Sequence, residues 1–146
     1  MSRRDDRGSA VVEFVWLGLL LLVPLVYVLL TVFEAQAAAY GSDAASRSAG
    51  RAFVLSPSQE QGEERARAAA QLALADHGIA PGQVRVDISC APDPARCLSP
   101  GSSVRVSVTV RQPLPLVPSA LGGNAPSVTM SSTHVEPYGT FREDRS

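Results

Sequence analysis

The stretch FVWLGLLLLVPLVYVLLTVF, residues 14–33, decides how the rest of the chain is organised. It holds twenty residues without a charged side chain. A helix rises about 1.5 Å per residue, so this run is long enough to cross a hydrocarbon layer of about 30 Å. Gly18 and Pro24 interrupt it, but membrane helices tolerate both residues, and Pro24 predicts a kink. We therefore predict one membrane-spanning helix over residues 9–33.

The nearest basic residues lie on the N-terminal side of this run. Arg3, Arg4 and Arg7 precede it, whereas the first basic residue after it is Arg47. Short flanks rich in Lys or Arg stay in the cytoplasm. The sequence thus predicts a single-pass topology with a cytoplasmic N-terminus and an extracytoplasmic C-terminal part.

The same run could instead belong to a secretory signal peptide. Small residues at 35–37 and 37–39 offer two cleavage sites. The apolar region of a signal peptide has only about 7–15 residues, however, and this run is longer. Cleavage there would release the remainder as a secreted protein.

Glu13 is a carboxylate at the edge of the apolar run, where an ionised side chain is costly without a partner. It could mark the membrane boundary among the headgroups, or stabilise the positive end of the helix dipole. A third interpretation begins with MSRRDDRG, a short polar leader that ends in Gly8. Cleavage after Gly8 would make Ser9 the N-terminus, and its cationic amine could then be neutralised in lipid by Glu13 of the same or a neighbouring chain.

Residues 7–14, RGSAVVEF, followed by a long apolar helix with a proline near its middle, resemble the processing signal of type IV prepilins. In particular they are similar to the TadE-like pseudopilins of the tight-adherence (Tad/Flp) pilus system. The resemblance implies a protein of the bacterial cell membrane that a prepilin peptidase cuts after Gly8, with Ser9 as the mature N-terminus. It also implies that Glu13 acts in assembly with other pilin subunits and the assembly platform.

The chain differs from the major pilins of that system in two ways. Those pilins resemble Glu-Tyr at this point and end shortly after the helix. This chain has Glu13-Phe14 and a sizeable exported part. The resemblance therefore implies a minor pilin, a pseudopilin, and not the main fibre subunit.

Residues 34–55 are rich in Ala and Ser and lack Pro, so we expect the helix to continue through them. Small residues recur there every four positions and form a seam that another backbone can approach closely. The seam consists of Ala37, Gly41, Ala45 and Ala49. We expect it to pack against the domain's own sheet, unless it reflects only a high alanine content.

A second helix is expected after this continuation. Ser56 is the predicted N-cap, Pro57 the first helical residue, Gln59 the capping-box partner and Gly78 the C-terminal cap. Its apolar stripe is predicted to contain Ala66, Ala69, Ala70 and Ala73.

The remainder is predicted to form strands. Valine or isoleucine alternates with polar residues over 84–88 and 104–110, and a third strand is expected over about 127–135. Between the second and third strands, Leu114, Leu116, Val117 and Leu121 could be core or an exposed patch.

The fold class is therefore α+β: a long transmembrane helix, a second helix and a small three-stranded antiparallel sheet. The expected segments are a leader (1–8), the spanning helix (9–33), its extracytoplasmic continuation (34–55), an α+β domain (56–138) and a flexible polar tail (139–146).

Cys90 and Cys97 are the two cysteines of the chain. In an exported domain such a pair predicts a disulfide, here in the connection between the first two strands, with free thiols as the alternative. Closing so short a loop stabilises a fold by about 2–3 kcal/mol on a chain-entropy estimate. A zinc site would need two further ligands, and His77 and His134 do not have a recognisable ligand spacing.

Composition and motifs argue against several classes of function. The formal net charge of −1 is not that of a nucleic-acid-binding surface. We expect no cofactor and no enzyme, because no nucleophile elbow, carboxylate pair or phosphate loop is present; Asp87 and His134 are interpreted as surface or structural residues. Three hypotheses remain: a processed pseudopilin, an unprocessed membrane-tethered binding module of the cell envelope, and a secreted enzyme or factor.

Overall fold

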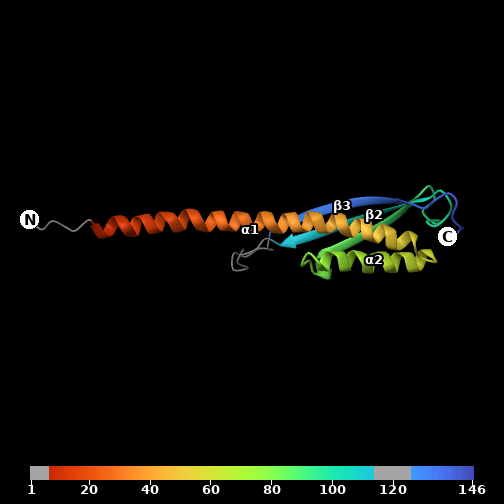
Figure 1. Ribbon diagram of the computed structural model, residues 1–146, viewed down its shortest axis with the longest axis horizontal. Helices are drawn as coiled ribbons and strands as arrows, with labels where there is room; N and C mark the ends of the chain where they lie inside the picture. Colours follow the sequence, from red (N-terminus) through yellow and green to blue (C-terminus); the bar gives the residue numbers. More distant parts are fainter. Residues whose placement is uncertain (1–6, 114–125) are drawn as a thin grey trace, which may run out of the picture.

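The computed structural model describes residues 7–113 and 126–146, with side chains from residue 10 onward, and it has an α+β fold (Figure 1). The predicted fold class is confirmed. The elements in order are α1 (Arg7–Val54), α2 (Gln59–Ala75), a short 3-10 helix (Pro81–Gln83), β1 (Val84–Ala91), β2 (Ser103–Pro113) and β3 (Ser127–Pro137). The expected core-or-patch residues between the second and third strands lie outside the described residues.

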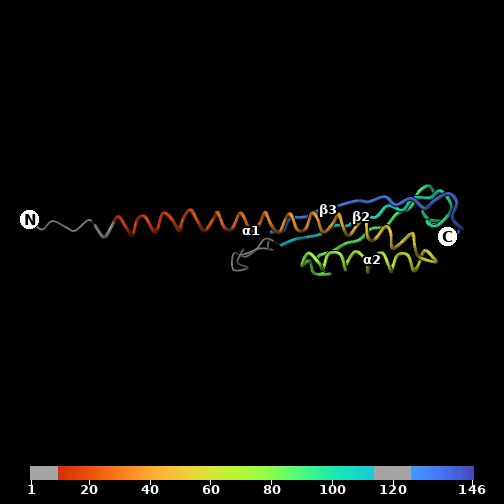
Figure 2. The backbone as a smooth tube through the Cα atoms, in the orientation of Figure 1, coloured from red at the N-terminus to blue at the C-terminus, as the bar shows by residue number. Residues whose placement is uncertain are grey.

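α1 is one helix of 48 residues that runs unbroken through Pro24. Its N-terminal part projects alone from the rest of the molecule, while its C-terminal part lies beside α2 and the sheet (Figures 1 and 2). The boundary between the projecting and the packed part of α1 coincides with a change in side-chain size along the sequence. Large apolar side chains fill the projecting part, and small ones occupy the packed part, where Ala38, Ala45 and Ala49 are completely buried.

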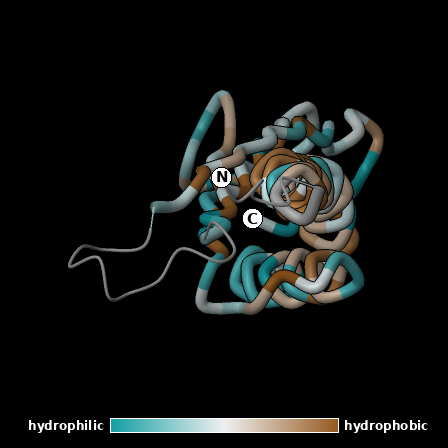
Figure 3. Tube along the Cα trace, turned by 90° about the vertical axis from the view of Figure 1, so that its left-hand side faces the viewer, coloured by the Kyte–Doolittle hydropathy of each residue, from teal (hydrophilic) through white to brown (hydrophobic). Residues whose placement is uncertain are grey.

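The sheet has the order β1-β2-β3, and both pairings are antiparallel. β2 is central, and its alternate valines are completely buried: Val104, Val106, Val108 and Val110. The predicted period-two pattern is therefore confirmed, with one buried face. Viewed along the long axis from the N-terminal end, α1 is a largely hydrophobic coil seen end-on, with α2 below it (Figure 3).

The start of α2 differs from the prediction. Ser58, not Ser56, is the N-cap, and its hydroxyl accepts a hydrogen bond from the Gln61 amide at 3.4 Å. Ser56 is buried, and its hydroxyl donates instead to the Ala52 carbonyl at 2.7 Å. This side chain therefore serves the end of α1, which is why the predicted cap lies two residues too early.

The end of α2 agrees with the prediction. Gly78 has a φ of 73°, a left-handed conformation that favours glycine. The amide of Ile79 returns to the Leu74 carbonyl at 3.1 Å, as in a common helix ending.

The C-terminal segment was expected to be a flexible tail, and instead it makes specific contacts. The Tyr138 hydroxyl donates to the Glu143 carbonyl at 2.6 Å. Arg142 donates to the Val54 carbonyl at 2.8 Å, and the Arg145 amide donates to the Leu98 carbonyl at 3.0 Å. The tail thereby joins the end of α1 to the loop after β1, and these contacts are tertiary, so the polar composition alone did not reveal them.

Candidate functional site: an exposed apolar helix with one carboxylate

The projecting part of α1 is an exposed apolar surface. Its most apolar window is 0% buried, and α1 is the one helix among the described residues that is long and apolar enough to span a membrane. Phe14 is 77% exposed, Trp16 67% and Leu21 65%. In water such a surface is unfavourable by about 25 cal/mol per Å², so an apolar environment must cover it.

Glu13 is the one charged residue between residues 10 and 33, and it is exposed on this surface. It lies four residues after Ser9, and both positions belong to α1. Residues four apart lie on the same face of a helix, so the backbone places the two predicted processing and assembly positions in line. Arg7 and Gly8 form the beginning of the same helix, so the peptide bond between Gly8 and Ser9 lies in its first turn.

The predicted seam of small residues is buried, and one of its contacts is with the segment after α2. Gly41, Ala45 and Ala49 are buried, and Ala37 is half-buried. A methyl group on Gly41 would lie 3.2 Å from the ring of His77, which follows α2. The segment after α2 therefore covers part of this seam, whereas the sequence predicts a contact with the sheet.

The neighbouring face of α1 contacts β3. The Ser132 hydroxyl donates to Asp43 at 3.3 Å and lies 3.4 Å from the Ser46 hydroxyl. A methyl group on Gly50 would come within 3.3 Å of atoms of both His134 and Glu136. A polar contact thus joins α1 to β3, and small residues on α1 make room for it.

His134 and Glu136 form a hydrogen-bonded pair on the helix-facing side of β3, with Nε2 and Oε2 3.0 Å apart. The imidazole is held there by a carboxylate of its own strand, and it is partly buried against α1. This environment agrees with the structural role expected for His134. Asp87 is on the opposite, exposed face, where it pairs with Arg85 at 3.1 Å.

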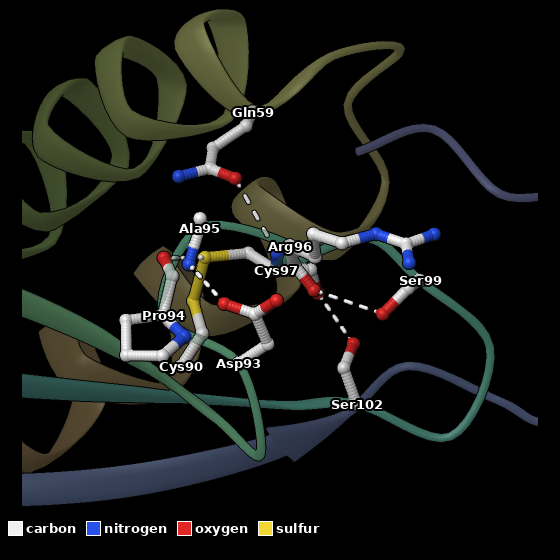
Figure 4. Close-up of a disulfide and its surroundings, with 9 residues drawn as sticks. All are labelled: Gln59, Cys90, Asp93, Pro94, Ala95, Arg96, Cys97, Ser99 and Ser102. Carbon is white, nitrogen blue, oxygen red and sulfur yellow. Dashed lines mark hydrogen bonds between the residues drawn. A yellow bond between two sulfur atoms is a disulfide. The ribbon is translucent and has the colours of Figure 1, made fainter.

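Cys90 and Cys97 form a disulfide, and the chain has no free cysteine (Figure 4). This prediction is confirmed, and it removes the free thiols and the thiolates that zinc would need. The bond closes the loop between β1 and β2. The Cys97 amide donates to the Gln59 side chain at 3.3 Å, and the Ser102 hydroxyl donates to the Cys97 carbonyl. The disulfide loop is therefore tied to the start of α2 as well as to the sheet.

Sequence reasoning missed one polar contact near this loop, an ion pair between Arg96 and Asp144. Hydrogen bonds from the side chain and the amide of Ser146, together with Arg96, hold the pKa of Asp144 below its ordinary value. The two partners lie 48 residues apart, and no local pattern indicates such a pairing.

The described residues contain no cluster of three His, Cys, Asp or Glu side chains that could hold a metal ion. Among the described residues, the candidate functional feature is the exposed apolar part of α1 with its single carboxylate, Glu13. The chain matches no protein-family model, and it has no significant similarity to a curated protein or to a solved structure.

Proposed function

We propose that this chain is a pilin-like minor subunit, a pseudopilin, that is cut after Gly8 and takes part in assembly of a Tad/Flp-type pilus or its secretion machinery. The observation that carries the proposal is the division of α1. One half is exposed and apolar, and the other half packs against α2 and the sheet of the α+β domain. Such a helix can be stored in a membrane and then transferred into a bundle of similar helices, because both environments cover the same apolar surface.

Glu13 supplies the specificity of this transfer. A carboxylate on an otherwise uncharged helix surface is costly in lipid, and a nearby cation lowers that cost. Cleavage after Gly8 creates such a cation, the α-amino group of Ser9. Pairing of Glu13 with the amine of a neighbouring copy would also set the axial position of one helix against the next.

The position of the proposed cut is compatible with a peptidase that works at the membrane surface. The bond between Gly8 and Ser9 lies in the first turn of α1. The first amides of a helix have no partner within the helix, so this turn opens more easily than the interior. A membrane-embedded prepilin peptidase is the proposed enzyme, with the cytoplasmic leader as the part that it recognises.

Release by signal peptidase is disfavoured by the position of the alternative sites. Residues 35–39 lie within α1, and Ala38 is completely buried against the domain. A protease needs an extended segment, and opening α1 here would disrupt packing.

The mature N-terminus tests the processing step. We expect the intact mass of the membrane-extracted protein, expressed with a prepilin peptidase, to lack residues 1–8. Gly8→Val should block cleavage, because a branched side chain replaces the residue at the scissile bond. Gly18→Val is the matched control, since Gly18 lies in the same helix and a methyl group on it would have no described neighbour within 4 Å. Full-length protein in the presence of active peptidase would support the membrane-tethered binding module instead.

Glu13→Gln tests the assembly step separately. We expect this variant to remain in the membrane and to lose incorporation into a complex with pilin subunits, measured by co-purification after mild detergent extraction. Glu34→Gln is the control, because Glu34 is the first acidic residue after the apolar run. Normal incorporation of Glu13→Gln would show that charge pairing by Glu13 is not required.

A further inference from the structure

The membrane-proximal end of the sheet lies level with the end of the apolar run. A small cavity of about 10 Å³ lies between them, lined by Thr31, Glu34 and Ala35 of α1 and by Gln112 and Val128 of the sheet. Thr31 still belongs to the apolar run, and Glu34 is the first charged residue after it. The sheet therefore begins where the apolar surface ends, without a stalk between them (Figure 1).

If α1 spans a bilayer, this end of the sheet lies close to the membrane surface. The headgroup region adds about 5–8 Å on each side of the hydrocarbon layer. A strand rises about 3.3 Å per residue, so the last residues of β2 and the first of β3 fall within or just above the headgroups. The end of β1 that carries Val84 lies nearby, because Val84 pairs with Val110.

The surface at this end of the sheet has the chemistry of an anion site. Arg85 and Arg111 line the same shallow depression, of about 400 Å³, on the sheet face that points away from the helices. Gln83, Thr109 and Thr129 line it as well, and each can donate a hydrogen bond. No carboxylate lines the depression, although Asp87 nearby accepts hydrogen bonds from Nε of Arg85 at 3.1 and 3.2 Å. Two guanidinium groups with neighbouring hydroxyls are typical of phosphate recognition.

We propose that this depression binds the phosphate of anionic lipid headgroups in the same bilayer that α1 crosses. The binding would hold the domain upright on the membrane before assembly, and it would be released when the subunit leaves the bilayer. The proposal rests on the membrane span of the proposed function. It is independent of cleavage after Gly8.

The chain offers a matched control on the same strand. Arg105 is exposed on the same face of β2, six residues from Arg111 and about 20 Å further from the membrane. Ser127 pairs with Pro113 at the membrane-proximal end of β3, and Val135 pairs with Arg105 near its other end. Neither residue lines the depression, so each can carry a label while Arg111 or Arg105 carries a charge change.

The test uses the full chain in vesicles of phosphatidylcholine with or without phosphatidylglycerol. A fluorophore is attached to a single new cysteine at Ser127, Val135 or Leu22, without reductant, so that the native disulfide does not react. Headgroup-labelled nitroxide lipid should quench the Ser127 label and not the Val135 label, and only when phosphatidylglycerol is present. Arg111→Glu should lower the ratio of docked to undocked domain by about fivefold or more, since one basic residue near an anionic surface contributes about that factor. Arg105→Glu should leave it unchanged.

The other outcomes overturn the proposal in distinguishable ways. Equal quenching at Ser127 and Val135, with the Leu22 label quenched by acyl-chain nitroxides, would reject lipid docking and keep the membrane span. An unquenched Leu22 label would reject the span itself. Shielding of the Ser127 label from a soluble quencher in detergent without phospholipid would assign this surface to a protein contact.

Discussion

Phe53 and Gly62 show how single residues hold the two helices together. The Phe53 ring is completely buried, and a methyl group on Gly62 would lie 3.2 Å from it. Gly62 therefore gives the ring room at the point where α2 crosses α1. At the other end of the helix pair, Gly41 makes room for His77 in the same manner. Phe53 and Tyr138 are the largest of the completely buried side chains among the described residues, so the Phe53 ring fills a large part of this contact.

Phe53→Ala is expected to destabilise the domain by about 3–5 kcal/mol, because it removes a buried ring and leaves a cavity. Leu55→Ala is the control: Leu55 lies two residues away and is 63% exposed, so its loss should change stability by less than about 0.5 kcal/mol. Chemical denaturation of the full chain in detergent, followed by far-UV circular dichroism, measures both. Equal effects of the two substitutions would contradict the assigned packing.

At the scale of elements, the loop between β1 and β2 is where the chain is most strongly cross-linked. The disulfide closes a loop with a sequence separation of 7, and the C-terminal tail contacts the same loop through Leu98 and Arg96. Arg142 connects this region to the end of α1. Covalent, ionic and hydrogen-bonded contacts thus join the β1–β2 loop, the C-terminal tail and the end of α1, at the end of the domain opposite the projecting part of α1.

Replacing both Cys90 and Cys97 with Ser should lower the free energy of unfolding by about 2–3 kcal/mol, because the unfolded chain regains the entropy of an open loop. The same denaturation experiment measures the loss. Reductant provides the internal control: it should weaken the natural chain by a similar amount and have no effect on the double variant. Reductant sensitivity of the double variant would show that another process is being measured.

The whole molecule has two halves with different requirements. None of the residues from 10 to 33 is buried, whereas α1 beyond residue 37 contributes much of the core. The first half needs lipid or other helices, and the second half is already covered by α2 and the sheet. This division is what the proposed transfer from membrane to assembly requires.

A chain that starts at residue 34 should therefore remain folded and become soluble without detergent. Circular dichroism and size-exclusion chromatography check this expectation. A chain that starts at residue 46 is the control, since it lacks Ala38, Ser42 and Ala45, which are buried in the complete domain. It should aggregate or unfold. Insolubility of the longer fragment would mean that residues 10–33 contribute to the core.

Much of this molecule follows from local patterns in its sequence. Uniform hydrophobicity over residues 14–33, alternation in β1 and β2, and a glycine after α2 each express a rule that acts within one element. These patterns determined the long helix, the strands and the fold class. The position of Glu13 and the residues before it also define the processing hypothesis, which remains a prediction.

Only the tertiary structure decided which surfaces meet. It placed the segment after α2 against the seam of small residues, moved the cap of α2 from Ser56 to Ser58, and brought the tail, which polarity predicted to be flexible, into contact with the end of α1. It also brought Arg85 and Arg111 together at the level where the apolar run ends. The physical reason is the same in each case. These contacts join residues far apart in the chain, and their energies depend on which partner covers each surface, which no local pattern of residues encodes.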